Sequence, residues 1–156
     1  DTINLQKNYT YDPQSIICRK AGGESILLMA DNRKVPFCQI DHALIGSETF
    51  YNHIKLGINS DAVSVFTNKE KLRLKKNKIS RYMKTSSMGN PAVLYCLQRK
   101  GRVINYSNGK NYISICKLQD NSQISSWTLF NGAGNSYGLA NALTHRVDQR
   151  IGKNLE

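Results

Sequence analysis

Four cysteines are the residues whose type and spacing predict chemistry most directly. Nineteen residues separate Cys18 from Cys38, and nineteen also separate Cys96 from Cys116. An even number of regularly spaced cysteines in a small protein favours disulfides formed in an oxidising compartment. A zinc site would need closely spaced cysteine pairs or nearby histidines, and the sequence has neither pattern.

The segments around the two cysteine pairs resemble each other, which indicates an internal duplication. An Asp-Pro pair begins six residues before the first cysteine, and an Asn-Pro pair begins six residues before the third. Downstream, residues 47–52 align with residues 126–131 after an insertion of one residue. Four cysteines allow three connectivities, and the repeat favours Cys18–Cys38 with Cys96–Cys116.

Each copy is predicted to hold its first cysteine on a short helix and its second on a β-hairpin. The expected helices, with Asp12 and Asn90 as N-caps, cover residues 14–20 and 92–99. The expected strands cover residues 25–30, 34–38, 102–107 and 110–116, with turns at Asp31-Asn32 and Asn108-Gly109. A disulfide from helix to hairpin closes a loop of about twenty residues, which stabilises the fold by roughly 3 kcal/mol.

Three other features give local expectations. Pro36 has no backbone N–H, which predicts that its strand lies at a sheet edge. The segments near Phe50 and Trp127 are predicted as short helices or strands, and Trp127 is expected in the core. Apolar residues at helical spacing predict a helix over residues 139–151.

Together these patterns predict an α+β fold of two tandem disulfide-stapled helix–β-hairpin modules with a pseudo-twofold relation. The expected units are a first module at residues 9–68, a basic linker at 69–88, and a second module at 89–156 that ends in a C-terminal helix. A core from only about 40 to 50 residues needs covalent support.

The chain is strongly basic, with a formal net charge of +11 from 22 Lys and Arg against 11 Asp and Glu. Such a charge favours anionic partners. We interpret the basic run in the linker as an anion- or partner-binding strip, against the alternative of a solvated connector. Its residues are Lys69, Lys71, Arg73, Lys75, Lys76, Lys78, Arg81 and Lys84. Binding to such a strip should weaken steeply with salt.

The second copy carries a recognisable pattern of residues. The pattern consists of Asn90, Pro91, Ala92, Tyr95, Cys96, Gly101, Gly109, Cys116 and Trp127. It resembles the small bacterial "putative hemolysin" domain family of unknown function. The first copy is a degenerate version, with Asp12, Ile17 and Glu48 in place of the Asn, Tyr and Trp. The resemblance implies an exported bacterial protein, often periplasmic or a lipoprotein, and it implies no mechanism.

No catalytic or metal-binding pattern stands out in the sequence. His42, His53 and His145 fit no spaced ligand set, and nucleophile elbows and phosphate loops are lacking. His42 is interpreted as part of an exposed turn. We therefore expect no enzymatic activity, no metal and no cofactor. No apolar run approaches the roughly 18 to 20 residues of a transmembrane helix.

The sequence predicts a non-enzymatic exported bacterial binding protein that is periplasmic, outer-membrane associated or secreted. Asp1 at the start is compatible with a removed signal peptide. The expected partner is a protein or an anionic envelope component, and not nucleic acid. One alternative is an inhibitor or immunity protein of a secreted protease or lysozyme, acting through loops 30–34 and 107–111. A hemolysin-like toxin is the other alternative, and only the family resemblance suggests it.

Overall fold

The computed structural model describes residues 6–7, 11–69 and 90–145, and its elements follow the same order in both halves of the chain. The first half contains β1 (Gln6–Lys7), α1 (Pro13–Lys20), β2 (Glu24–Ala30), β3 (Arg33–Ile40), β4 (Ala43–Gly46), α2 (Ser47–Leu56) and α3 (Asp61–Thr67). The second half contains α5 (Pro91–Gln98), β5 (Arg102–Ser107), β6 (Tyr112–Lys117), β7 (Gln123–Ser125), α6 (Ser126–Asn131), the 3-10 helix η2 (Ala133–Asn135) and α7 (Tyr137–Leu143).

The helices that carry the first cysteine of each pair begin where their capping residues predict. Asp12 Oδ1 accepts a hydrogen bond from the Ser15 N–H at 2.8 Å, and Asn90 Oδ1 accepts one from the Ala92 N–H at 2.9 Å. A proline follows each cap, where its fixed φ suits the first helical turn and no N–H is needed. Both predicted N-caps are therefore confirmed, and each helix begins one residue earlier than predicted, at Pro13 and Pro91.

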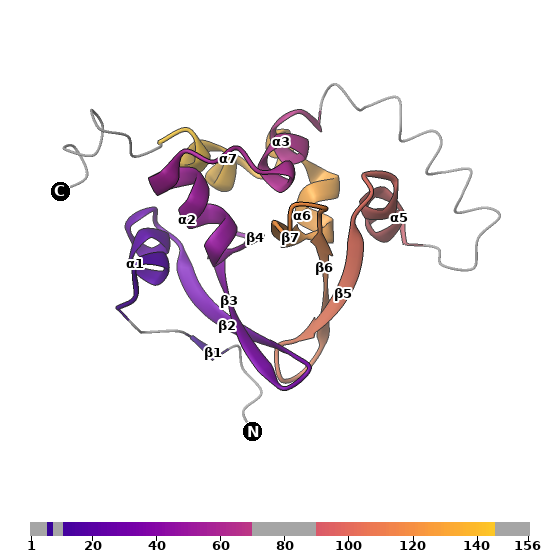
Figure 1. Cartoon of the computed structure of the whole chain (residues 1–156), viewed down its shortest axis with the longest axis horizontal. Helices are drawn as coiled ribbons and strands as arrows, with labels where there is room; N and C mark the ends of the chain where they lie inside the picture. Colours follow the sequence, from indigo (N-terminus) through magenta and orange to yellow (C-terminus); the bar gives the residue numbers. More distant parts are fainter. Residues whose placement is uncertain (1–5, 8–10, 70–89, 146–156) are drawn as a thin grey trace.

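The strands of both halves form one six-stranded antiparallel barrel, which places the chain in the α+β class. The strand order is β2-β3-β4-β7-β6-β5, and a pairing of Met29 in β2 with Ser107 in β5 closes the ring. β1 adds a further strand to β2, with Gln6 opposite Leu27. The hairpins β2–β3 and β5–β6 converge at the lower end of Figure 1, and the helices gather at the upper end.

The two halves meet along β4 and β7, where Ile45 pairs with Ile124. Two threonines at matching positions of the two halves each accept a hydrogen bond across this junction. Thr49 Oγ1 accepts a hydrogen bond from the Gln123 N–H at 2.9 Å, and Thr128 Oγ1 accepts one from the Leu44 N–H at 3.1 Å. Each half therefore satisfies a backbone donor of the other half.

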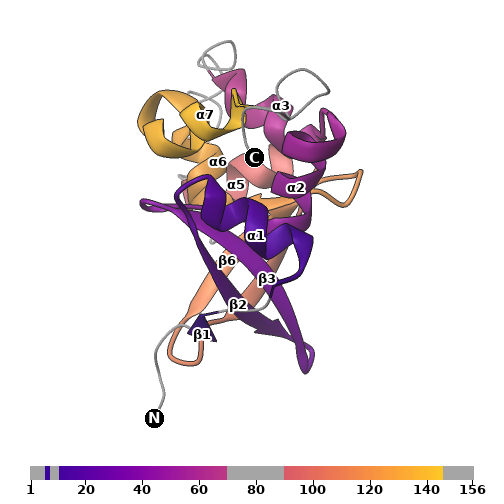
Figure 2. The same ribbon diagram turned by 90° about the vertical axis from the view of Figure 1, so that its left-hand side faces the viewer.

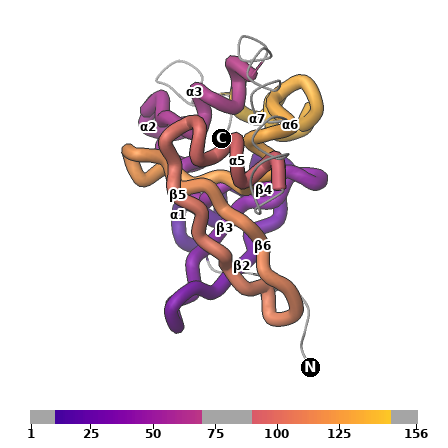
Figure 3. Tube along the Cα trace, turned by 90° about the vertical axis from the view of Figure 1, so that its right-hand side faces the viewer, coloured from indigo at the N-terminus to yellow at the C-terminus, as the bar shows by residue number. Residues whose placement is uncertain are grey.

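Successive side chains of a strand point to opposite faces of the sheet, so the buried residues form two separate cores. One core fills the barrel with Ile26, Leu28, Phe37, Leu44, Tyr106 and Ile115. The larger core lies between the barrel and the helices, and it includes the four cysteines, Phe50, Phe66, Tyr95 and Leu129. From opposite sides, Figure 2 shows α1 against β2 and β3, and Figure 3 shows α5 against β5 and β6.

The last helix of each half packs on the opposite half, an arrangement that no local pattern in the sequence predicts. Helix α3 contacts α6, and α7 contacts α2. The β6–β7 turn also caps α3, because Ser122 Oγ accepts a hydrogen bond from the Ala62 N–H at 3.0 Å. The helix predicted over residues 139–151 begins at Tyr137 and ends at Leu143, and residues 146–151 lie outside the described part.

The prediction of an edge strand at Pro36 was wrong, because β3 lies between β2 and β4. Pro36 pairs with Leu27 of β2, whereas pairing with β4 begins one residue later, at Phe37. The proline thus occupies the part of β3 that has a strand on one side only, where a missing donor costs little. In the described part of the chain, no helix is long and apolar enough to cross a membrane.

Candidate functional site

Both disulfides predicted from the repeat are present, Cys18–Cys38 and Cys96–Cys116. Each joins Cα atoms 5.7 Å apart and connects the first helix of its half to the second strand of the hairpin. All four cysteines are fully buried and none is free. Because a reactive cysteine must be an accessible thiolate, these four have a structural role and supply no nucleophile.

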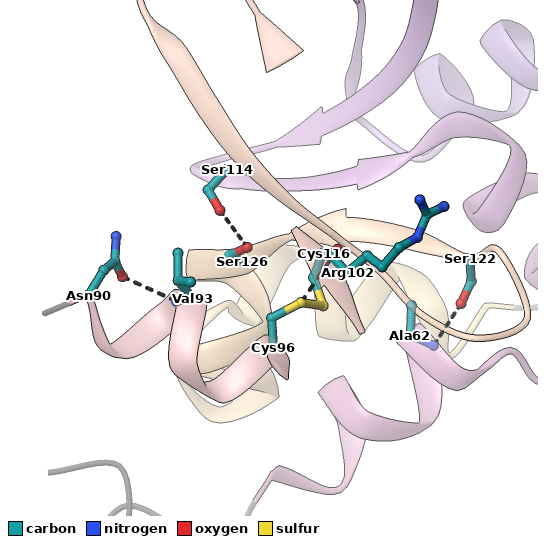
Figure 4. The surroundings of a disulfide bond; sticks show 9 residues. All are labelled: Ala62, Asn90, Val93, Cys96, Arg102, Ser114, Cys116, Ser122 and Ser126. Carbon is teal, nitrogen blue, oxygen red and sulfur yellow. Dashed lines mark hydrogen bonds between the residues drawn. A yellow bond between two sulfur atoms is a disulfide. The ribbon is translucent and has the colours of Figure 1, made fainter. Parts of the chain in front are cut away.

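A glycine packs directly on each disulfide. A Cβ atom at Gly101 would lie 2.6 Å from Cys116 Sγ, and one at Gly23 would lie 2.8 Å from Cys38 Sγ. Figure 4 shows the second disulfide, Cys96–Cys116, beside Arg102. The signal was available in the sequence, because each glycine stands five residues after the first cysteine of its pair.

Lys69 is the one residue of the predicted basic strip that the structure describes, and its side chain is buried. It is 8% exposed, and its ammonium group donates a hydrogen bond to the Phe130 carbonyl oxygen near the end of α6. Gly132, with a φ of +77°, makes room because a Cβ there would overlap the Lys69 side chain. Lys69 therefore lies in the protein interior and not on an exposed strip. The other seven residues lie outside the described part: Lys71, Arg73, Lys75, Lys76, Lys78, Arg81 and Lys84.

The ammonium group of Lys69 lies between two aromatic rings, 4.5 Å from the ring centres of Tyr95 and Phe130. The guanidinium carbon of Arg99 lies 5.7 Å from the Tyr95 ring centre. Burial raises the pKa of Tyr95 to about 12, although the positive charge of Arg99 acts in the opposite direction. Tyr95 is therefore neutral at physiological pH, and this group serves packing through cation–π contacts.

Trp127 extends this aromatic group to the surface, so the prediction that it lies in the core was wrong. Its ring meets Phe130 edge-on with centres 5.8 Å apart, yet 45% of the residue is exposed. Leu129, two residues later, is fully buried instead. The repeat contained a signal for this arrangement, because the position equivalent to Trp127 in the first copy is the exposed Glu48.

The tips of the two long hairpins lie at the same end of the barrel, held there by the Met29–Ser107 pairing (Figure 1). At the first tip, Asp31 and Asn32 have φ values of 51° and 63°, as a tight type I′ turn requires. At the second tip, Asn108 Oδ1 accepts hydrogen bonds from two backbone N–H groups, those of Lys110 and Asn111. Both turns are exposed and locally braced, which suits contact with a partner.

The histidines occupy separate environments. His42 is exposed, as predicted. His53 is buried, with Nε2 2.9 Å from the Leu143 carbonyl oxygen, which joins α2 to α7. His145 Nδ1 lies 2.9 Å from the Asn141 carbonyl oxygen. Among residues 6–7, 11–69 and 90–145, no group of three or more His, Cys, Asp or Glu residues is arranged to hold a metal.

Two of the hollows in the described part of the molecule lie beside α7 and α3, the helices that pack on the opposite half. One, of about 230 Å³, is mainly apolar and is lined by α1, α2 and α7, including Ile17, Ala21 and Ile54. The other, of about 320 Å³, lies between α3 and α5 and has a mixed polar and apolar lining that includes Asp61 and Arg99. Side-chain chemistry contributes to this difference, because Ala21 in the lining of the first hollow corresponds to Arg99 in the lining of the second.

Residues 87–133 match the family model of a domain of unknown function (DUF333), which is known to occur in putative hemolysin proteins. The matched segment covers α5, β5, β6, β7, α6 and the second disulfide, which confirms the family resemblance for the second copy. No curated protein and no solved structure gives a significant match to the chain.

Proposed function

We propose that this protein is a non-enzymatic bacterial binding protein, exported from the cytoplasm, that engages an acidic partner through its basic residues. One observation carries the proposal: seven of the 22 Lys and Arg residues fall within residues 71–84, between the two disulfide-stapled segments. A dense group of cations raises the local concentration of an anionic partner and accelerates its association.

The charged residues in the described part of the chain also favour a negatively charged partner. Residues 90–119 contain five Lys and Arg and no Asp or Glu. The two disulfides are consistent with an oxidising compartment, namely the periplasm, the outer-membrane surface or the medium. The proposed partner is accordingly a protein or an anionic component of the envelope.

We also infer that the two halves are related by a pseudo-twofold axis and that they correspond to residues 9–68 and 89–156, joined by the basic linker 69–88. Pairing between matching positions supports this relation, as for Ile45 with Ile124 and Met29 with Ser107. The reciprocal hydrogen bonds of the two threonines support it as well.

Charge reversal within the basic run tests the proposed function. The change of Lys71, Arg73, Lys75 and Lys76 to Glu should weaken binding to polyglutamate, or to vesicles that contain anionic lipid, by about tenfold or more at low salt. The wild-type affinity should itself fall steeply with added salt. Binding is measured by fluorescence anisotropy or co-sedimentation at two salt concentrations.

The matched control changes four exposed cations elsewhere, Lys20, Lys34, Lys55 and Lys110, to Glu, and so alters the net charge equally. An equal loss of binding in both variants would show that only net charge matters. Unchanged binding in the first variant would remove the basic run from the function.

The two adjacent hairpin tips favour a second candidate function, inhibition of a secreted hydrolase. Rigid exposed loops lose little conformational entropy on binding, which suits an inhibitor. If this function holds, the protein should inhibit at least one member of a panel of proteases and lysozymes, and the double change Arg33→Ala and Lys34→Ala should weaken that inhibition by about tenfold. The absence of inhibition across the panel would remove this candidate.

A further inference from the structure

Strand β5 has an edge that no described strand covers along most of its length. One side of β5 pairs with β6 from Arg102 to Ser107. On the other side, the pairing of Ser107 with Met29 is the only one among the described residues. The backbone groups that point outward from residues 102–106 therefore lack strand partners in the described part of the chain.

The matching edge in the first half is covered. Ser25 pairs with Cys38 and Val103 pairs with Cys116, so β2 and β5 correspond residue for residue. On β2 this edge is occupied by β1, which runs antiparallel and places Gln6 opposite Leu27. The position in β5 that corresponds to Leu27 is Asn105, so the barrel itself provides an example of strand addition at this edge.

The β5 edge lacks the features that usually block strand addition. Protected edges carry proline, several charges or a bulge. β5 contains no proline, its single charged residue is Arg102 at the start, and its pairing with β6 is continuous. Val103 and Ile104 are only partly buried. Such an edge can hydrogen-bond to an extended peptide through its main chain, as in β-augmentation.

Charge distinguishes between the strands that could occupy this edge. Glu24 begins β2, whereas the corresponding residue of β5 is Arg102. A second copy that paired through its own β5 would bring together two segments, each with five cations and no carboxylate over residues 90–119. This repulsion disfavours a second copy and favours an acidic strand.

We propose that the edge of β5, from Arg102 to Tyr106, binds an extended acidic segment of a partner protein as an additional antiparallel strand. The proposal rests on the proposed function only for the sign of the partner's charge. The main-chain ladder supplies the affinity, and Arg102 selects for a carboxylate side chain near one end of the added strand.

The test uses the full chain and a fluorescent nine-residue peptide of alternating glutamate and valine. Two matched peptides serve as controls: one replaces glutamate by lysine, and the other is methylated at every backbone nitrogen and so cannot donate to a ladder. We expect only the first peptide to bind, and hydrogen exchange at residues 102–106 to slow when it does. Arg102→Glu should weaken this binding at least tenfold, whereas Lys110→Glu, at the exposed far end of the same hairpin, should change it less than threefold.

Several results would overturn the proposal. These are equal binding of the methylated peptide, equal effects of the two variants, or the absence of binding by the first peptide. Slow exchange along β5 in the free monomer would show that the chain already covers this edge, and loss of binding on dimerisation would assign the edge to a second copy. Charge reversal at residues 71–76 tests the proposed function separately, because the peptide can bind β5 in that variant.

Discussion

Replacement of Cys96 and Cys116 together by alanine is expected to lower the free energy of unfolding by about 3 kcal/mol. The disulfide connects α5 to β6 across a sequence separation of 20 residues, and its loss enlarges the conformational freedom of the unfolded chain. Removal of the buried sulfurs also leaves space in the core on which Gly101 packs. The same change at Cys18 and Cys38 should have a similar effect, because the two loops are equally long.

Urea unfolding followed by far-UV circular dichroism and by Trp127 fluorescence measures this effect. Since both halves contribute strands to one barrel, loss of either disulfide should shift both signals together. A reducing agent should have no further effect on the variant that lacks all four cysteines. A change below about 1 kcal/mol would contradict the stapling role given to the bond.

Replacement of Ile124 by alanine is expected to destabilise the protein by about 2–4 kcal/mol. Ile124 is fully buried in β7 and pairs with Ile45 of β4, which is also fully buried. The change removes apolar contacts at the junction between the halves and leaves a cavity. Ile45→Ala should have a comparable effect for the same reason.

A double-mutant cycle at these two positions measures the coupling across the junction. We expect a coupling of about 0.5 kcal/mol or more, because residues in direct contact do not contribute additively. Ile58→Ala is the control, since 47% of Ile58 is exposed, and it should cost less than about 1 kcal/mol. Strict additivity of Ile45→Ala and Ile124→Ala would show that this pair does not couple the halves.

The features that the sequence predicted correctly depend on residues close together in the chain. The caps at Asp12 and Asn90 act over three residues, and each hairpin is defined by its own turn. The disulfides span longer loops, but the repeat restricted their pairing. The α+β class follows directly from these local elements.

The closure of the barrel could not be predicted in the same way, because it depends on pairings between residues far apart in sequence. Met29 meets Ser107, and Ile45 meets Ile124, in antiparallel pairs that no local pattern specifies. Lys69 illustrates the same problem for the candidate site. Its neighbours in sequence are basic, yet tertiary contact with Phe130 places it in the interior.

Trp127 is a different case, because the sequence contained the information. A large aromatic residue is usually buried, and this tendency led to the prediction of a core position. Comparison with Glu48 at the same place in the first copy would have indicated the surface. Where a chain contains an internal duplication, each copy therefore constrains the burial pattern of the other.

The reciprocal packing of α3 on α6 and of α7 on α2 has a consequence for biosynthesis. A ribosome makes the chain from the N-terminus, so residues 11–69 emerge before any residue that covers β4 or receives α3. The Ile45 side chain, which pairs with Ile124, and the apolar face of α3, which packs on α6, remain exposed to solvent until the residues up to Asn131 have been added. Growing polypeptides with such exposed surfaces are prone to aggregation. Synthesis of β7 and α6 is therefore a precondition for burying the apolar surface of the first half.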